Sequence, residues 1–290
     1  MLLVSFAKVV LIASVLEAHG DSNGKGFKFL GSEFWPSNFM EHCSNQRNDN
    51  SHSADLSCYS YHINLERVNV EIMSRKPLLL VYRHFAGESE RNQFIDDINQ
   101  NSLEYQNVVD DSKGRILSSS RQANGTWFTH EQTEGSAKLY RKAVRLIPSI
   151  NFESSEFWQA LSYNSGGHYA PHYDFLEYER EEDHDFWMKH YGNRFATFLL
   201  ILKTAEVGGG TTFPLISTTV KPYPGDAILW MNMTPEGRGD TTSLHGACPI
   251  IEGNKIAATL WIRERGQEMR TKQVNPIKHD IEPFIRPFHL

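Results

Sequence analysis

Residues 157–175 read FWQALSYNSGGHYAPHYDF, and this stretch decides the fold class. Two short segments rich in aromatic and apolar residues flank Gly166-Gly167, a pattern typical of two β-strands joined by a turn. Similar segments recur later in the chain, as RFATFLLIL (194–202), DAILWM (226–231) and IAATLWI (256–262). Many short strands separated by Gly/Pro turns predict a β-sandwich or barrel.

The N-terminal half has a different pattern. PLLLVYR (77–83) predicts one more strand, and Ser89 can cap a helix with Phe94 and Ile98 on one face. Apolar residues at helical spacing predict a second helix over 136–147. The sequence therefore predicts a mainly β fold with flanking helices. The domain is expected over 61–270, with its β-rich core at about 155–265 and a tail over 271–290.

Composition excludes several classes of protein. The chain has 290 residues, 40% of them hydrophobic, which is enough apolar side chain to bury a sizeable core. The formal net charge of −6 is spread along the chain, which argues against nucleic acid as a partner.

The first twenty residues, MLLVSFAKVVLIASVLEAHG, resemble a secretory signal peptide. Lys8 precedes a short apolar run, and Ala18-His19-Gly20 offers a cleavage site with small residues. A buried first strand or helix is the alternative. No other segment is long and apolar enough to cross a bilayer.

Residues 21–60 form a polar leader that contains two of the three cysteines. In an oxidising compartment Cys43 and Cys58 are expected to pair and close a loop, which leaves Cys248 as a small buried hydrophobic residue. Asn124 and Asn232 begin Asn-x-Thr sequons and are candidate glycosylation sites if the chain is secreted.

Three side chains suggest a metal site. His172 and Asp174 stand two residues apart on a predicted strand, so they point to the same face. With His245 they can occupy one face of an octahedron and leave the opposite face open, a ligand set that suits Fe(II). A zinc site could use the same donors.

Lys255 favours a particular cosubstrate. It begins the strand that follows His245, and a buried ammonium is costly unless it is paired. The distal carboxylate of a bidentate 2-oxo acid would pair with it. Thr259 lies on the same strand face and could add a hydrogen bond. The alternative is a lysine that reaches solvent.

Six motifs in order make the resemblance specific. Over roughly residues 60–270 the chain resembles the catalytic domain of the collagen-type prolyl 4-hydroxylases. The motifs are HYAPHYDF, GNRFATFLLIL, GGGTTFP, PGDAILW, LHGACPI and GNKIAATLWIRERGQE. The resemblance implies a double-stranded β-helix (jelly roll).

The resemblance also assigns roles. His172, Asp174 and His245 match the family's iron ligands, and Lys255 matches its 2-oxoglutarate-binding lysine. Two tyrosines and a tryptophan match aromatic positions near the site. Tyr163 is expected to bind 2-oxoglutarate, and Tyr169 and Trp261 to line the substrate pocket, with core packing as the alternative.

The activity implied by the resemblance is hydroxylation of prolyl residues to 4-hydroxyproline in collagen-like or other proline-rich secreted peptides. Fe(II) and 2-oxoglutarate are the implied cofactor and cosubstrate, succinate and carbon dioxide are the co-products, and ascorbate keeps the iron reduced. The implied location is the lumen of the endoplasmic reticulum, and protein disulfide isomerase is an implied partner.

Departures from the family pattern leave alternatives open. Ile201 stands where the family usually has a tyrosine, so 2-oxoglutarate affinity is expected to be low. The chain is short, and IRPFHL carries no retention signal, so secretion is an alternative location. Residues 177–193 form either a lid over a peptide groove or a solvated loop. The same chemistry on lysine or a small molecule, or a secreted binding module that keeps the fold, are the other functions.

Overall fold

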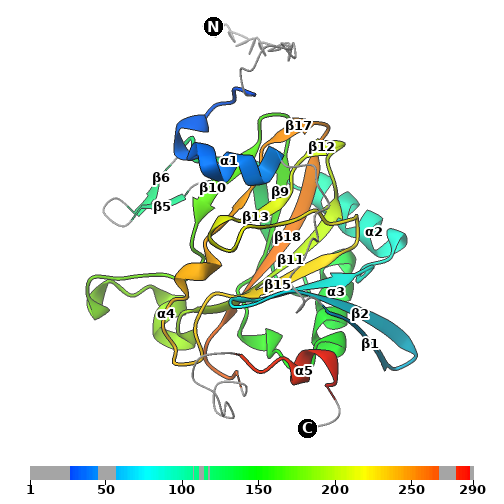
Figure 1. Cartoon of the computed structure of the whole chain (residues 1–290). Helices are drawn as coiled ribbons and strands as arrows, with labels where there is room; N and C mark the ends of the chain where they lie inside the picture. The colour runs from blue at the N-terminus through cyan, green and yellow to red at the C-terminus, as the bar shows by residue number, and fades with distance from the viewer. Residues whose placement is uncertain are drawn as a thin grey trace, which may run out of the picture.

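The structure is a computed structural model that describes residues 27–44, 57–106, 108–110, 114–116, 118–267 and 279–287. The predicted signal peptide lies outside the described residues, as do parts of the polar leader and of the tail. The described chain consists of antiparallel β-sheets with helices packed beside them, as expected (Figure 1).

A large sheet of nine strands forms the centre of the fold, in the order β1-β2-β3-β15-β11-β18-β9-β8-β4. All neighbours in it are antiparallel. The sequence predicted five of its strands, β3, β9, β11, β15 and β18. The strands are β1 (Ser57–Ile63), β2 (Glu66–Arg75), β3 (Leu78–Arg83), β4 (Glu104–Tyr105), β8 (Asn124–Phe128), β9 (Trp158–Tyr163), β11 (Arg194–Lys203), β15 (Ala227–Met231) and β18 (Lys255–Arg263).

A smaller sheet has five strands in the order β14-β13-β16-β10-β7. They are β7 (Arg121–Gln122), β10 (His168–His172), β13 (Thr211–Phe213), β14 (Thr218–Val220) and β16 (His245–Ala247). Two short pairs complete the described strands: β12 (Val207–Gly208) with β17 (Ile250–Glu252), and β5 (Val108–Asp110) with β6 (Gly114–Ile116).

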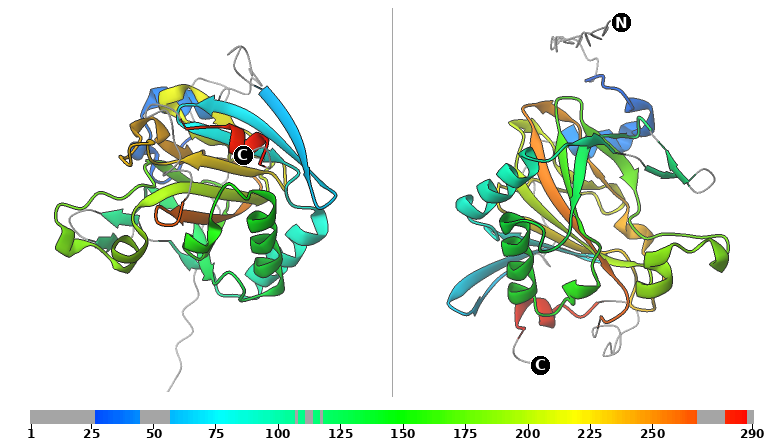
Figure 2. Two further views of the ribbon diagram at one scale, coloured as in Figure 1. Left: turned by 90° about the horizontal axis from the view of Figure 1, so that it is seen from below. Right: turned by 180° about the vertical axis from the view of Figure 1, so that it is seen from behind.

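The helices are mostly short. α2 (Glu88–Asn99) and α3 (Glu134–Leu146) lie side by side against one side of the large sheet (Figures 1 and 2). The remaining helices are α1 (Ser37–Ser44), α4 (Phe186–Tyr191) and α5 (Glu282–Ile285), with 3-10 turns at η1 (Ser32–Phe34), η2 (Phe152–Ser154), η3 (Glu181–Asp183), η4 (Pro214–Ile216) and η5 (Thr241–Ser243). None of the helices in the described ranges could span a membrane.

The two predicted helices are confirmed, with one correction. α2 is capped by Gly87, whose backbone N–H donates to the Glu90 carboxylate, so Ser89 lies inside the first turn and does not cap it. α3 begins after Thr133, whose hydroxyl accepts from the Ser136 backbone N–H.

The strand alternation of β18 sorts its side chains between two environments. Ile256, Ala258, Leu260 and Ile262 belong to the main apolar core on the side of α2 and α3. The residues between them, which include Lys255 and Thr259, face the opposite side. The fold therefore brings Lys255, Ala257, Thr259 and Trp261 into one cavity.

The predicted disulfide between Cys43 and Cys58 is wrong. Cys43 pairs with Cys248, with 5.6 Å between their Cα atoms, and Cys58 is an exposed free thiol. The reason is that α1 lies against the smaller sheet, where the Thr219 hydroxyl donates to the His42 carbonyl. Cys58, in contrast, lies on edge strand β1 of the large sheet (Figure 1).

The prediction that Asn232 carries a glycan is also contradicted. Its side chain is fully buried and its amide donates to the Thr197 hydroxyl, so a glycan cannot be placed there in the folded protein. Asn124 begins β8 and is partly exposed, so glycosylation there stays a prediction.

Candidate metal and cosubstrate site

The three predicted metal ligands lie together. β10 and β16 pair so that His172 stands opposite His245, and Asp174 follows two residues after His172. One candidate ligand atom from each residue lies within 4.8 Å of the others. His172 Nε2 is 3.6 Å from Asp174 Oδ1, and His245 Nε2 is 3.5 Å from Asp174 Oδ2. This donor set fits one divalent metal ion.

Backbone contacts orient both imidazoles. His172 Nδ1 lies 2.8 Å from the Ala170 carbonyl oxygen, and His245 Nδ1 lies 3.0 Å from that of Ser243. A carbonyl oxygen can only accept, so Nδ1 carries the proton and Nε2 is left to bind a metal. Such contacts are typical of histidines that bind metals.

The protonation states also suit metal binding. Burial alone would raise the pKa of Asp174, but the neighbouring His245 and His172 hold it well below its usual range. Burial lowers the pKa of His245 to about 4, which outweighs the opposite effect of Asp174. At neutral pH the site therefore presents a carboxylate and a neutral imidazole.

Lys255 is a buried cation beside this cluster. Its side chain is almost fully buried, and it stands opposite Tyr163 in the pairing of β18 with β9. Its Nζ donates to the Gly209 carbonyl at 2.8 Å, but no carboxylate of the described residues forms an ion pair with it. Burial lowers the pKa of Lys255 to about 8. An anionic ligand would offset the cost of burying this charge.

One cavity brings the predicted site residues together. All eight of those expected to bind metal, 2-oxoglutarate or substrate line it: Tyr163, Tyr169, His172, Asp174, His245, Lys255, Thr259 and Trp261. They come from β9, β10, β16 and β18, together with the turn that follows β10. The cavity thus joins a possible metal site to a site for an anion.

Comparison with known proteins places the chain in a family. Residues 158–263 match the model of the 2OG-Fe(II) oxygenase superfamily. The chain is 30% identical over 254 residues to probable prolyl 4-hydroxylase 7 of Arabidopsis thaliana, and the match covers 80% of this chain and 77% of that protein. This chain belongs to the prolyl 4-hydroxylase family.

Two further relatives are informative. The chain is 31% identical over 207 residues to prolyl 4-hydroxylase subunit alpha-2 of Caenorhabditis elegans, a match that covers 71% of this chain but only 38% of that subunit. A crystal structure of the viral collagen prolyl hydroxylase of Paramecium Bursaria Chlorella virus-1, a 2OG complex, is 27% identical with a TM-score of 0.50. That match covers 64% of this chain and 95% of the viral one. The predicted double-stranded β-helix is confirmed as the fold of this family.

Sequence reasoning missed Arg121, which lies in the cavity of this prolyl 4-hydroxylase-type chain. Its guanidinium lies 4.6 Å from the centre of the Tyr169 ring and donates to Gln159 Oε1 at 2.7 Å. Tyr169 in turn stacks on His172, with 3.6 Å between ring centres. The strand that carries Arg121 has two residues, too short for a hydrophobic pattern to reveal it.

A charged pair beside Trp261 was also missed. Arg194 forms a two-pronged ion pair with Glu156, and its guanidinium lies 3.8 Å from the Trp261 ring centre. Trp127 packs at 5.9 Å from Trp261 and is 39% exposed, so it extends this aromatic wall to the surface. The available signal for Arg194 was a charged residue at the start of β11, a strand that is otherwise almost entirely apolar.

The departure at Ile201 remains visible in the fold. Ile201 is fully buried and does not line the cavity, which the same strand reaches with Thr197 and Leu199. Ile201 offers no hydroxyl, so the low 2-oxoglutarate affinity expected from this departure stays a prediction.

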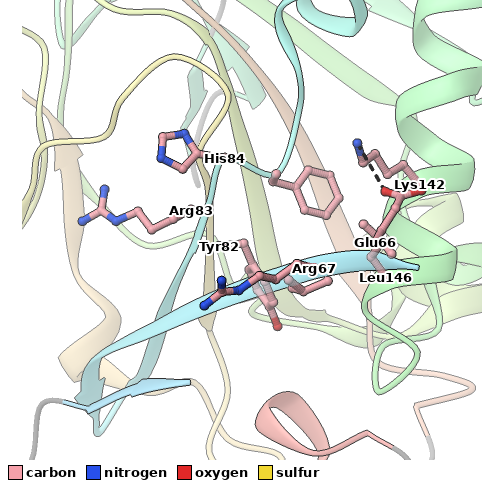
Figure 3. A pocket seen from close by; sticks show the side chains of 9 residues that line it. Glu66, Arg67, Tyr82, Arg83, His84, Lys142 and Leu146 are labelled. Carbon is pink, nitrogen blue, oxygen red and sulfur yellow. Dashed lines mark ion pairs between the residues drawn. The ribbon is translucent and has the colours of Figure 1, made fainter. Parts of the chain in front are cut away.

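A second cavity, of about 130 Å³, has a different character (Figure 3). It lies between β2, β3 and α3, and its charged side chains pair with other residues of the chain. Lys142 Nζ is 2.8 Å from Glu90, and Arg83 contacts both Glu71 and Asp226. Unlike Lys255, Lys142 and Arg83 already have carboxylate partners.

Proposed function

We propose that this chain is an Fe(II)- and 2-oxoglutarate-dependent dioxygenase that hydroxylates prolyl residues in proline-rich peptides. The observation that carries the proposal is the shared cavity. In it, a cluster of two histidines and one aspartate lies beside Lys255, a buried lysine with no carboxylate partner in the described chain. Family membership and the names of the relatives support the same activity.

The side chains would divide the work as follows. His172, Asp174 and His245 would hold Fe(II), which supplies the oxidative chemistry when bound. The Lys255 ammonium would pair with the distal carboxylate of 2-oxoglutarate, and the Thr259 hydroxyl would hydrogen-bond to it. One atom of dioxygen enters the prolyl C–H bond to form hydroxyproline. The other enters 2-oxoglutarate, which is converted to succinate and carbon dioxide.

Aromatic side chains near the cavity support a peptide substrate. Trp127 adjoins the cavity residue Trp261. Phe157 is 42% exposed and packs edge-on against Trp187 of α4. Aromatic surfaces are typical binding sites for extended proline-rich segments. Two segments project from the same side of the molecule: the one with η3 and α4, and the pair of strands β5 and β6 (Figures 1 and 2). This position suits the proposed lid at 177–193.

The secretory pathway is part of the proposal. The Cys43–Cys248 disulfide supports an oxidising compartment such as the lumen of the endoplasmic reticulum, because disulfides are rare in the cytosol. Ascorbate is proposed as the reductant for the iron, and protein disulfide isomerase as a partner that would retain the chain there.

A turnover assay tests the proposed function. Purified protein is incubated with Fe(II), 2-oxoglutarate, ascorbate and (Pro-Pro-Gly) repeats, and succinate and hydroxyproline are measured together. Equal amounts of both products are expected. Background succinate with every peptide would contradict the dioxygenase, whereas succinate without hydroxyproline would contradict only the prolyl substrate and favour lysine or a small molecule.

A further inference from the structure

Asp174 receives a short hydrogen bond from outside the metal cluster. The Thr197 hydroxyl on β11 donates to Asp174 Oδ2 at 2.6 Å, and both side chains are buried. Thr197 lies in the large sheet, whereas His172 and His245 belong to the smaller sheet. The hydrogen bond therefore ties the carboxylate to the opposite wall of the cavity.

A second buried group continues this chain of hydrogen bonds. Asn232 directly follows β15, and its Nδ2 donates to Thr197 Oγ1 at 2.8 Å. The Asn232 side chain is fully buried, and its Oδ1 has no hydrogen-bond partner in the described part of the chain. A buried amide that leaves one atom unpaired is costly, so packing alone does not account for this residue.

The chemistry of the three groups fixes the direction of both hydrogen bonds. An ionised carboxylate can only accept, so Thr197 must use its single hydroxyl proton for Asp174. Its oxygen is then left as an acceptor for Asn232 Nδ2, which can only donate. The reverse orientation of the amide would place Oδ1 against Thr197 and compete with Asp174 for the same proton.

We propose that Asn232 and Thr197 are positioning residues that hold the Asp174 carboxylate in the orientation required to bind the metal. Without the hydroxyl, the carboxylate could rotate about its Cβ–Cγ bond and move its oxygens away from the two Nε2 atoms. The hydrogen bond restricts this rotation before any metal arrives. The inference rests on the metal site of the proposed function and adds two residues that do not contact the metal.

Metal binding by the apoprotein tests this positioning role without relying on turnover. The full chain is stripped with EDTA and titrated with Mn²⁺ by calorimetry, and the absorption spectrum of the Co²⁺-loaded form reports the ligand geometry. Thr197→Val removes the hydroxyl at nearly constant shape, and Thr197→Ser restores it. Thr212→Val is the matched control, because Thr212 is also fully buried and its hydroxyl forms a hydrogen bond with that of Thr219, away from Asp174.

The expected result is a graded loss of metal affinity. Thr197→Val should raise the Kd for Mn²⁺ by about 10- to 100-fold and change the Co²⁺ spectrum, the range typical when a group that orients a metal ligand is lost. Thr197→Ser should stay within about threefold of the wild type, and Asn232→Ala should raise the Kd by roughly tenfold. Thr212→Val should change the melting temperature without changing the Kd.

The positioning role is contradicted if Thr197→Val binds Mn²⁺ as tightly as the wild type and has the same Co²⁺ spectrum. If Thr197→Val does not fold, Asn232→Ala decides, because a Kd equal to that of Thr212→Val would also overturn it. If the wild type binds Mn²⁺ but forms no hydroxyproline, the proposed substrate is contradicted, and the variants still decide the positioning role. A wild type that binds neither metal contradicts both proposals.

Discussion

Both faces of the large sheet are buried, but only one of them places buried charged and hydroxyl groups around a cavity. The face towards α2 and α3 is packed with aromatic and aliphatic side chains, such as Phe94, Trp158 and Phe198, whose rings contact one another edge-on or tilted. The other face of the same strands carries Thr197 and Lys255 around the cavity, beside a smaller apolar cluster that includes Trp230. Successive residues of one strand thus enter two different environments.

This difference separates stability from binding. Burial of apolar side chains is the main favourable term in folding, so the helix-covered face should account for most of the stability. Buried polar groups cost free energy unless they are paired, and among the described residues Lys255 donates to a backbone carbonyl but pairs with no carboxylate. Substitutions on the two faces should therefore change different measurements.

The largest effect is expected in the cavity. His172→Ala should lower turnover by at least about 10³-fold, because the metal loses one of three protein ligands, a loss equivalent to about 4 kcal/mol. The metal-free protein should melt within a few degrees of the wild type, since the His172 side chain is partly exposed. Succinate release and thermal unfolding in EDTA measure the two effects. His62→Ala is the control, because His62 is exposed on β1. A large fall in the melting temperature of metal-free His172→Ala would contradict the separation of stability from binding.

The opposite face should show the reverse. Phe198→Ala should lower the free energy of unfolding by about 3–5 kcal/mol, because a fully buried ring that contacts Phe85 and Phe152 is replaced by a cavity. Urea unfolding measures it. The Kd for Mn²⁺ of the folded protein should stay the same. Phe186→Ala is the matched control, since Phe186 is 60% exposed, and an equal loss of stability there would contradict the role of burial.

Lys255→Ala should change cosubstrate binding more than stability. Loss of the ammonium should raise the Kd for 2-oxoglutarate by about 100-fold, since truncation of one partner in a buried charge pair typically costs about 2–5 kcal/mol. Calorimetry with the Mn²⁺-loaded protein measures this Kd. Lys142→Ala is the control, because that lysine pairs with Glu90 in the other cavity. An unchanged Kd in Lys255→Ala would remove Lys255 from the binding site.

The same contrast explains what the sequence could predict. Short-range patterns predicted β9, β11, β15 and β18, because an apolar run bounded by turns shows a buried strand directly. Seven of the eight site residues could be found because they stand in ordered motifs, and Tyr163 ends the predicted strand just before the first of them. Thr197 lies inside one of these motifs, but its proposed role depends on Asn232, which follows a different strand and matches a local sequon pattern.

Long-range contacts were the main source of error. Cys43 and Cys248 are 205 residues apart in sequence, and only the position of α1 against the smaller sheet brings them together. Proximity along the chain favoured Cys58 instead. The Asn232 sequon failed for the same reason, since burial of that side chain follows from packing between strands and not from the local sequence.

The smallest predicted effect is the pH dependence of cosubstrate binding. Burial lowers the pKa of Lys255 to about 8 in the free protein, and a bound carboxylate must raise it by favouring the charged form. Binding above pH 8 therefore requires uptake of a proton, so the Kd for 2-oxoglutarate should rise by about tenfold per pH unit there and be insensitive to Lys255 below it. His245 does not add to this trend, because its pKa of about 4 keeps it neutral throughout the range. Calorimetry between about pH 7 and pH 9.5 measures the trend, with Lys255→Arg as the control, since a guanidinium stays charged and should remove the dependence. A flat profile in the wild type would mean that the Lys255 ammonium does not pair with the ligand. The cost of burying its charge would then not be offset by a bound carboxylate.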